Sequence, residues 1–450
     1  MLELNYIREN KNDVISGLEK RNFKDLGLIE EIILTDKIRR ETQKNLDSKL
    51  HEANSLTKEI GLFFKSGNIK KAENFKLKSA EIKTTTKLLQ EKLDSIEKKL
   101  SELRFQVPNI PNSIVKKGFS EKDNEEIETF GKINKLEENL IPHWELAKKY
   151  NLIDFDLGSK ITGAGFPVYI DKGAKLQRAL INFFIDKNVK AGYREIQVPL
   201  LVNEASGIGT GQLPDKEGQM YHVNNENLYL IPTSEVPLTN IYRNKIINEN
   251  ALPIKMTSYT PCFRREAGSY GSHVRGLNRL HQFDKVEIVE IVKPEESDNA
   301  LNKMISHVKD ILIELELPSR ILRLCSGDLG FTSSLTYDFE LYSVGQKKWL
   351  EVSSVSNFES FQSERLQLRY KTKKGEKNLL HTLNGSSLAL PRVIAALLEN
   401  NQSKDGIRIP KALIPYTNFD MIYWNLKKLN ILKNDFSKTK KKIRSTFPER

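Results

Sequence analysis

A long segment near the N-terminus has helical hydrophobic spacing and lacks helix-breaking residues. Between about Asp25 and Arg104 the chain contains no proline and only three glycines. In the second half of this segment, the less polar positions recur at alternating steps of four and three, at Ile82, Thr86, Leu89, Leu93, Ile96, Leu100 and Leu103. A looser copy of the same stripe precedes them at Leu46, Ala53, Leu56, Ile60 and Phe63. This spacing is typical of two helices that pack along one narrow seam.

A turn separates the two periodic halves. The sequence Lys-Ser-Gly-Asn at residues 65–68 combines residue types that favour turns. We therefore predict an antiparallel helical hairpin, or arm, of roughly 35 residues per helix and on the order of 50 Å in length. Pro108 and Pro111 end the second helix and place a domain boundary after it.

The rest of the chain mixes short strand-like and helical segments. Helical spacing predicts helices over Ala174–Val189, Pro294–Leu317 and Pro391–Gln402. Apolar runs predict strands over Glu195–Val202, Asn227–Ile231, Lys285–Val292 and Lys348–Val355. Helices and strands in irregular order, without an internal repeat, favour an α+β domain built on an antiparallel sheet.

Composition excludes several classes of protein. With 450 residues, 38% hydrophobic and 29% charged, the chain fits two globular domains and neither a collagen-like nor a disordered protein. Its longest apolar run has only six residues, Val393–Leu398, and its first residues do not resemble a secretory signal. Cys262 and Cys325 form no C-x-x-C motif, so we expect neither zinc nor a disulfide framework. The expected location is the reducing cytoplasm, with no membrane partner.

The positive charge is concentrated in two places. The net charge is +12, and residues 427–450 hold nine Lys or Arg residues against Asp435 and Glu449. The segment from Lys58 to Lys87, around the predicted turn of the arm, contains eight lysines and only three glutamates. Both concentrations suit a polyanionic partner such as a nucleic acid. By themselves they are equally compatible with a solvated helix face and a frayed tail.

Residues 260–287 contain the densest set of candidate catalytic residues. Four arginines, at positions 264, 265, 275 and 279, fall within sixteen residues between two predicted strands. Strand alternation predicts that Arg264 shares a face with Glu266, and that Arg279 shares one with Phe283 and Glu287. Guanidinium groups, an aromatic plane and two carboxylates suit a nucleoside triphosphate together with a cationic group. The alternative is a surface hairpin with salt bridges, which the intervening glycines and the aromatic in register disfavour.

The same residues resemble a known family. Phe263-Arg-x-Glu266, followed by Gly-Leu-x-Arg279-x-His-Gln-Phe283-x-Lys-Val-Glu287, resembles motif 2 of the class II aminoacyl-tRNA synthetases, in the form found in seryl-tRNA synthetases. Further matches are residues 173–199 to motif 1, 384–392 to motif 3, 232–235 to the serine-binding loop and 351–354 to the metal and ATP element. With the arm, the resemblance covers residues 1 to about 420. Departures occur at Gly165–Tyr169 and at Ser387.

The resemblance implies a two-step reaction and a role for each matching residue. The serine carboxylate attacks the α-phosphorus of ATP, and the 3′-terminal ribose of tRNA then attacks the seryl adenylate. Arg264 would bridge the carboxylate and the α-phosphate, and Arg279 would bind the γ-phosphate. Glu266 would bind the adenine amino group, and Phe283 and Arg392 would sandwich the adenine ring. The implied catalytic residues are Arg264 and Arg392, and the implied ATP-binding set is Arg264, Arg265, Glu266, Arg279, Leu280 (through its backbone), Phe283, Glu351, Val352, Ser353, Ser354 and Arg392.

The resemblance also implies a serine pocket, a metal and partners. Glu351 and Ser354 would hold Mg²⁺ between phosphates, since oxygen ligands suit this hard cation. A pocket that hydrogen-bonds the substrate hydroxyl should reject alanine, and its small volume should exclude threonine, so no editing domain is expected. The implied partners are ATP, L-serine, tRNA(Ser), tRNA(Sec) and a second copy of the chain, joined through motif 1. The implied serine-binding residues are Thr233, Ser234, Glu235, Arg264, Glu287, Asn384 and Ser386, and the implied tRNA-binding residues are Lys65, Lys70, Lys71, Lys76 and Lys78.

The predicted organisation follows from these assignments. Residues 1–107 form a tRNA-binding domain with the arm, 108–120 a linker, 121–425 a class II catalytic domain and 426–450 a basic tail. Two alternatives stay open: an amino-acid-activating enzyme that loads a carrier protein, and a catalytically dead coiled-coil scaffold that binds nucleic acid. The first would lack the long basic arm, and the second should have lost residues such as Arg264 or Glu287. His281, Cys262 and Ser326 are interpreted as structural residues.

Overall fold

The computed structural model describes residues 1–133, 140–215, 218–266 and 275–423. Its chain divides into two compact units. The first comprises residues 1–123 together with 325–334, and the second comprises 124–324 together with 335–450. The basic tail predicted at 426–450 lies outside the described residues. In the described ranges, no helix combines the length and apolar character needed to cross a membrane.

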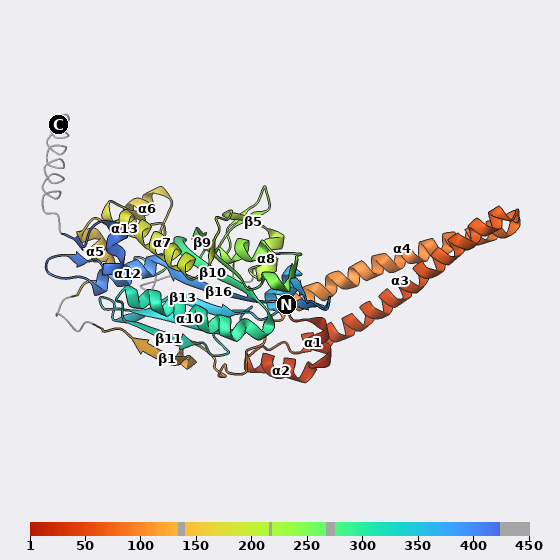
Figure 1. The fold of residues 1–450 in the computed structure, drawn as a ribbon, viewed down its shortest axis with the longest axis horizontal. Coiled ribbons are helices and arrows are strands. Elements are labelled where there is room, and N and C mark those ends of the chain that lie inside the picture. Colours follow the sequence, from red (N-terminus) through yellow and green to blue (C-terminus); the bar gives the residue numbers. More distant parts are fainter. Residues whose placement is uncertain (134–139, 216–217, 267–274, 424–450) are drawn as a thin grey trace, which may run out of the picture. The chain divides into compact units, whose positions relative to one another are not determined.

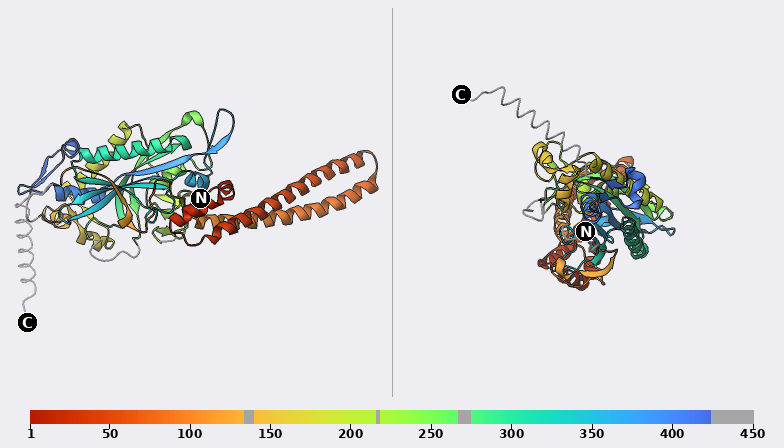
Figure 2. Two further views of the ribbon diagram at one scale, coloured as in Figure 1. Left: turned by 90° about the horizontal axis from the view of Figure 1, so that it is seen from below. Right: turned by 90° about the vertical axis from the view of Figure 1, so that its left-hand side faces the viewer.

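The first unit contains the predicted arm. Its helices are α1 (Leu4–Glu9), α2 (Lys11–Lys20), α3 (Gly27–Lys65) and α4 (Ile69–Gln106). Figures 1 and 2 show α3 and α4 side by side along their whole length. Every predicted seam position, from Leu46 to Leu103, is buried or half-buried, whereas the residues between them are mostly exposed. The helices meet at Gly67, whose φ of 75° suits glycine, and Phe63 packs edge-on against Phe75 with centroids 5.1 Å apart.

A half-buried arginine ties the base of this unit together. Arg21, on the last turn of the α2 region, donates hydrogen bonds to the carbonyl oxygens of Asn109 at 3.0 Å, Ser333 at 2.9 Å and Leu329 at 2.7 Å. The backbone N–H of Asn109 also bonds to the Phe331 carbonyl. Residues 325–334 therefore pack with residues 108–120, which were predicted to be a linker, inside the first unit.

The second unit is built on an eight-stranded sheet in its described part. Its strand order is β1-β11-β12-β13-β16-β10-β9-β4, and every neighbouring pair is antiparallel except β4 with β9. The predicted fold class, an α+β protein with an antiparallel catalytic sheet and a helical arm, is confirmed. The bounds are β1 Glu125–Phe130, β4 Arg194–Glu195, β9 Ile254–Phe263, β10 Gln282–Val292, β11 Ser319–Arg323, β12 Leu335–Ser343, β13 Lys348–Asn357 and β16 His381–Ala389.

Helices cover both faces of this sheet. α7 (Lys172–Lys190), α10 (Ser297–Glu314) and α12 (Leu390–Asn400) pack along one face, as the position of α10 in Figure 1 illustrates. On the other face, α9 (Glu235–Asn240) and α11 (Phe361–Leu366) contribute to an apolar core with Met256, Val289 and Ile291, and α8 (Glu204–Thr210) packs against both helices. Smaller helices are α5 (His143–Lys149), α6 (Phe155–Ile161) and α13 (Ile414–Thr417). The smaller sheets have the strand orders β5-β7-β6, β15-β14-β8, β2-β3 and β17-β18. Their bounds are β2 Ile153–Asp154, β3 Val168–Tyr169, β5 Leu201–Asn203, β6 His222–Val223, β7 Leu228–Leu230, β8 Ile246–Asn248, β14 Arg369–Lys371, β15 Lys377–Leu379, β17 Ile407–Arg408 and β18 Met421–Ile422.

Most predicted elements are confirmed, and one strand prediction is wrong. The helices expected at 174–189, 294–317 and 391–402 correspond to α7, α10 with a preceding 3₁₀ turn, and α12. The strand expected over Glu195–Val202 is instead two short strands, β4 and β5 (Leu201–Asn203), which belong to different sheets. Pro199 lies between them and has no N–H to donate, so the segment leaves one sheet before it joins the other.

Candidate active site

Two adjacent strands of the central sheet present the motif 2 residues. β9 and β10 pair without a break, from the pair Phe263 with Gln282 to the pair Ile254 with Ile291. Along β10, Phe283, Lys285 and Glu287 alternate onto one face, the face that α9 covers further along the strand. The prediction that strand alternation also orients Arg264, Glu266 and Arg279 is wrong, because β9 ends at Phe263 and β10 begins at Gln282.

Turn geometry and polar contacts orient those three residues instead. The Arg264 N–H donates to the His281 carbonyl at 3.0 Å, and its guanidinium carbon lies 5.3 Å from the centre of the Phe283 ring. Glu266 has a φ of 48°, and its carboxylate pairs with Arg279 at 3.2 Å. Arg265 is exposed, and its backbone N–H donates a hydrogen bond to the Gln219 carbonyl. Residues 267–274, which include two of the predicted loop glycines, lie outside the described residues.

Motif 3 reaches the same place from a different strand and helix. Arg392, in the first turn of α12, donates from Nη1 to the Glu351 carbonyl at 2.7 Å and from Nε to the Asn278 carbonyl at 3.1 Å. Asn278 lies four residues before β10 begins, so Arg392 joins the turn that leads into β10 to β13, and Leu280 in the same turn is buried. Arg392 also lies 3.9 Å from the Glu351 carboxylate. The structure thus brings motif 2, motif 3 and the Glu351 segment together.

A bulge in β13 explains how Glu351 and Ser354 face the same way. Simple alternation would put residues three apart on opposite faces. Phe339 pairs with Ser353 and Glu340 with Glu351, which leaves Val352 as the extra residue of a bulge. Asp338 and Glu340 share a face of β12, so their partners Ser354 and Glu351 share it too. Ser354 donates to Asp338 at 2.6 Å, and the Glu351 side chain is half exposed.

Glu287 is the centre of a buried polar network. Its carboxylate is fully buried and accepts hydrogen bonds from Thr233 Oγ1 at 2.8 Å, Asn384 Nδ2 at 2.8 Å and Ser386 Oγ at 3.4 Å. It also forms an ion pair with Lys285, which is 6% exposed. Ser353, another residue predicted to bind ATP, donates to the carbonyl of Ser386. Four residues of the predicted serine pocket therefore meet around one carboxylate.

Glu235 is a second buried carboxylate of this region. Its Oε1 accepts a hydrogen bond from Gln362 at 2.7 Å, and its N–H donates to Thr233 at 3.2 Å. Burial raises the pKa of the Glu235 carboxyl to about 7, and the nearby Glu287 adds to this against the opposing effect of Gln362. The neighbouring Ser234 hydroxyl is buried and has no hydrogen-bond partner among the described residues. The Ser234 hydroxyl is therefore available to a polar ligand.

Several residues that support this site were not identified from the sequence. Lys285 and Gln362 contact the two buried carboxylates, and Asp338 accepts from Ser354. The alternation Phe283-x-Lys285-x-Glu287 was a signal for Lys285, because it places the lysine on the same face as two predicted site residues. No local pattern points to Gln362, which comes from α11.

The two departures from the family pattern have structural explanations. Gly165 has a φ of 85°, and a Cβ there would lie 2.5 Å from the His281 ring, which also stacks on Phe166. His281 Nδ1 lies 2.6 Å from the Tyr221 hydroxyl, so its contacts agree with the predicted structural role. Ser387 is buried on the opposite sheet face and donates to Asn188 of α7 at 3.0 Å.

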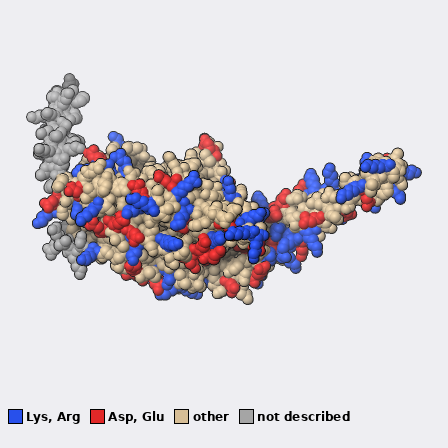
Figure 3. Space-filling model, viewed as in Figure 1, with Lys and Arg blue, Asp and Glu red and all other residues tan. Residues whose placement is uncertain are grey.

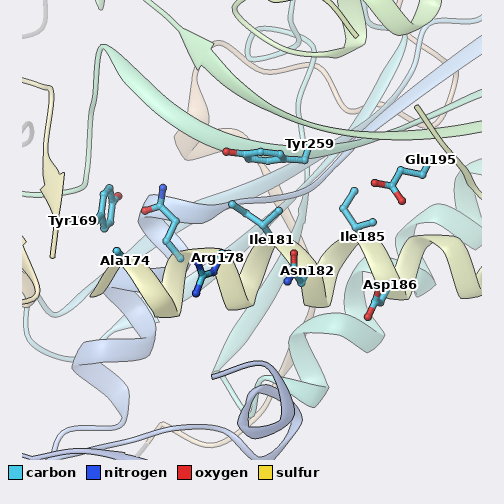
Figure 4. Close-up of a pocket in the computed structure, with 10 residues that line it drawn as sticks. Tyr169, Ala174, Arg178, Ile181, Asn182, Ile185, Asp186, Glu195 and Tyr259 are labelled. Carbon is cyan, nitrogen blue, oxygen red and sulfur yellow. The ribbon is translucent and has the colours of Figure 1, made fainter. Parts of the chain in front are cut away.

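A separate cavity lies beside α7. It has a volume of about 630 Å³ and is lined by side chains of α7 and by Tyr169, Glu195 and Tyr259. Figure 4 shows Tyr259 and Glu195 across from the α7 residues Arg178 and Asn182. Tyr259 donates to Asp284, which alternates to the face of β10 opposite Glu287. This cavity is therefore distinct from the predicted catalytic residues.

The arm tip is a second candidate site. Its five lysines, Lys65, Lys70, Lys71, Lys76 and Lys78, are all exposed. Figure 3 shows basic side chains around this end of the arm. Lys76 lies 4.8 Å from the centre of the Phe64 ring, and Phe64 and Leu77 are themselves exposed. The tip therefore combines positive charge with exposed apolar surface, a combination that suits nucleic acids.

Comparison with known proteins gives a consistent result over nearly the whole chain. Residues 1–111 match the family model "Seryl-tRNA synthetase N-terminal domain", and residues 219–401 match "tRNA synthetase class II core domain (G, H, P, S and T)". Serine–tRNA ligases of Salinibacter ruber and Akkermansia muciniphila are 46% and 43% identical, each over 94% of this chain and 99% of the relative.

A solved structure agrees with these matches. The seryl-tRNA synthetase of Pyrococcus horikoshii, solved in complex with ATP, is 33% identical and has a TM-score of 0.86, over 94% of this chain and all of that chain. Matches over nearly the whole chain favour a tRNA ligase over the two alternatives, an enzyme that loads a carrier protein and a catalytically dead scaffold. The chain belongs to the seryl-tRNA synthetase family, the class II enzymes that use ATP to attach serine to tRNA.

Proposed function

We propose that seryl adenylate forms on the β10 face that carries Phe283, Lys285 and Glu287. A serine carboxylate oxygen bonds to the α-phosphorus of ATP, and the bond from that phosphorus to the β-bridging oxygen breaks, so pyrophosphate leaves with the electron pair. Arg264 lies between Phe283 and the serine-binding loop, where its guanidinium can hold both anions. Holding two mutually repelling reactants in place is the main requirement of phosphoryl-type transfer.

Nucleotide binding uses the aromatic and cationic groups around Phe283. Adenine stacks on Phe283, with Arg392 on its other side and Glu266 and the Leu280 backbone at its edge. Arg279 binds the γ-phosphate, for which it must leave its exposed ion pair with Glu266, a contact worth little in water. Arg265, Val352 and Ser353 complete the proposed ATP site. Arg264 and Arg392 are the proposed catalytic residues.

Serine is selected by the network around Glu287. Glu287 and Glu235 bind the ammonium group, and Thr233, Ser234, Asn384 and Ser386 provide short polar contacts to the rest of the amino acid. The observation that carries this assignment is the set of three donors that meet on the Glu287 carboxylate, Thr233 from the loop before α9 and Asn384 and Ser386 from β16. An analogue without the hydroxyl would leave buried polar groups unpaired and would bind poorly.

The metal site fits Mg²⁺ by its donor atoms. The bulge puts the Glu351 carboxylate and the Ser354 hydroxyl on one face, and Mg²⁺ prefers one or two protein oxygens together with substrate phosphates. In the described ranges, no three His, Cys, Asp or Glu residues form a group that could hold a metal, so phosphates would supply most ligands. Bound Mg²⁺ would neutralise charge on the phosphates.

The proposed partners extend beyond the catalytic face. The arm tip binds tRNA(Ser), and by family likeness also tRNA(Sec), mainly through backbone charge and shape. A second copy of the chain packs against the motif 1 segment around α7, where the cavity beside Arg178 leaves surface open for a partner. We place the enzyme in the cytoplasm, where its substrates ATP and tRNA are present.

Serine-dependent ATP–pyrophosphate exchange tests the proposed site. We expect exchange with serine in the absence of tRNA, and charging of tRNA(Ser) when tRNA is added. Separate charging assays with tRNA(Sec) decide the finer specificity. Exchange that does not require serine, or an undiminished rate after Glu287→Gln, would contradict the assignment of the pocket.

A further inference from the structure

Lys285 is a buried cation without an assigned part in the reaction. It lies on β10 between Phe283 and Glu287, is 6% exposed and pairs with Glu287. Desolvation makes an isolated buried ammonium costly, so such groups are usually paired or functional. Its charge also acts on Glu235 and on Cys262, the β9 residue that pairs with Phe283. Lys285 therefore influences the whole pocket floor.

The position of Lys285 along β10 coincides with the place where the new bond forms. Phe283, Lys285 and Glu287 follow one another on one face at steps of roughly 7 Å. In the proposed function, adenine lies on Phe283 and the serine ammonium on Glu287. The mixed anhydride is the part of seryl adenylate between adenine and ammonium. It therefore lies over the residue between those two, which is Lys285.

The carboxylate oxygen of Glu287 that Lys285 contacts is also the more crowded of the two. Glu287 Oε1 already faces Thr233, Ser386 and Lys285, whereas Oε2 faces Asn384. A carboxylate oxygen has two lone pairs, so a substrate ammonium that binds Oε1 replaces one of its three donors, whereas Oε2 keeps one lone pair free. Lys285 is the donor with the longest and most flexible side chain. The substrate ammonium carries the same positive charge, so Glu287 stays neutralised when Lys285 moves away.

We propose that Lys285 is a second catalytic cation beside Arg264. In the empty site its ammonium neutralises Glu287, and when the substrate ammonium takes that place it moves to the carboxylate and α-phosphate oxygens. There it stabilises the negative charge that develops while the carboxylate–phosphorus bond forms and pyrophosphate leaves. This inference rests on the proposed function of the site. A preorganised donor in a buried site contributes about 10²–10³ in rate.

Two variants of Lys285 separate charge from structure. Lys285→Met removes both the charge and the donor, and Lys285→Gln keeps an N–H donor for Glu287 but has no charge. We expect both to lower the rate constant of serine-dependent pyrophosphate exchange about 10²–10³-fold. The matched control is Lys255→Met, because Lys255 pairs at 3.3 Å with buried Glu290 on the opposite face of the same strand. Its exchange rate should equal that of the wild type.

Ethanolamine provides a probe for the second half of the proposal. It has the ammonium and hydroxyl of serine but no carboxylate, so Lys285 should not assist its binding. Calorimetry should show that Lys285→Met binds ethanolamine at least as tightly as the wild type, while serine binding weakens.

Each outcome has a distinct meaning. Near-normal exchange by Lys285→Gln would overturn the catalytic role, since a donor that only holds Glu287 would then suffice. Equal losses of ethanolamine and serine binding would overturn it as well. Should Lys285→Met not fold, Lys285→Gln still decides. If the wild type itself shows no serine-dependent exchange, the proposed function fails, and this result is distinguishable from failure of the lysine hypothesis.

Discussion

The arm tip and the floor of the catalytic pocket use lysine in opposite ways. At the tip, five lysines are exposed and surrounded by water, and the contacts recorded for three of them are with phenylalanine rings. In the pocket, Lys285 is buried and ion-paired with a carboxylate that three polar side chains also contact. The tip charges are screened by salt, whereas charges in the pocket act through a medium of low dielectric.

This difference teaches which functions each region can perform. Exposed, flexible lysines can follow a phosphate backbone but hold no fixed geometry, so they suit recognition by charge and shape. Buried groups with matched partners are preorganised and can discriminate between substrates that differ by one hydroxyl. Changes in the pocket should therefore affect chemistry with little dependence on salt, and changes at the tip should do the reverse.

The largest expected effect concerns substrate discrimination in the pocket. Wild-type exchange should favour serine over alanine by about 10⁴–10⁵ in kcat/KM, because alanine leaves buried polar groups unpaired. Thr233→Ala and Ser386→Ala should reduce this ratio, because they slow exchange with serine and do not raise the rate with alanine by the same factor. Exchange rates measured with both amino acids check the prediction. Comparable wild-type rates would show that the hydroxyl is not read here.

Arg264→Ala tests the reacting centre. Its guanidinium lies against Phe283 and the Pro232 carbonyl, and we expect its loss to slow pyrophosphate exchange about 10²–10³-fold. Circular dichroism should be unchanged, and Arg194→Ala, on the exposed strand β4, is the matched control. A folded variant with normal exchange would remove Arg264 from the mechanism.

The arm should affect tRNA and not adenylation. Replacing residues 30–102 by a short linker should spare exchange but cripple tRNA(Ser) charging. In the full-length protein, we change the five tip lysines to glutamine. The slope of the logarithm of the tRNA association constant against the logarithm of salt concentration should then become less steep by about 4. Between 50 and 200 mM salt, wild-type binding would then fall roughly 10²-fold more than that of the variant.

A control variant locates this effect on the arm. Lys37, Lys44, Lys92 and Lys98 are exposed on the same two helices, nearer their other ends, and their change to glutamine should alter the salt dependence much less. If the truncated enzyme charges tRNA(Ser) at the full-length rate, the arm lysines are only a solvated surface.

The smallest expected effect is the pH dependence contributed by Glu235. Its pKa of about 7 means that the carboxyl is protonated below neutral pH, and the protonated form cannot pair with an ammonium. Serine affinity should therefore rise about tenfold from pH 6 to pH 8. Glu235→Gln should weaken binding and flatten this profile, as measured by calorimetry across the range. A wild-type profile already flat would place Glu235 outside the ammonium site.

Because the folded pKa of Glu235 exceeds its ordinary value of 4.5, the same group should make a falling contribution to stability as pH rises from about 4.5 to 7.

The arm could be predicted closely from the sequence because its structure depends on local periodicity. The seam from Leu46 to Leu103 needs only neighbours three and four residues away, and the turn at Gly67 needs only its own residues. The same holds for α7, α10 and α12. Motif residues such as Arg264, Glu287 and Arg392 could be found because their types and spacing match a family, although strand alternation did not correctly explain how Arg264 is oriented.

Contacts between distant segments could be decided only by the tertiary structure. Glu351 and Ser354 share a face because Val352 forms a bulge against β12, which no spacing within β13 predicts. Gln362 reaches Glu235 across 127 positions of sequence, and residues 325–334 join the first unit through Arg21, more than 300 positions away. The sequence determined which residues each element presents, because periodicity is local. Which buried donors and acceptors satisfy one another was decided by packing, since a buried polar group takes whatever partner the fold brings within reach.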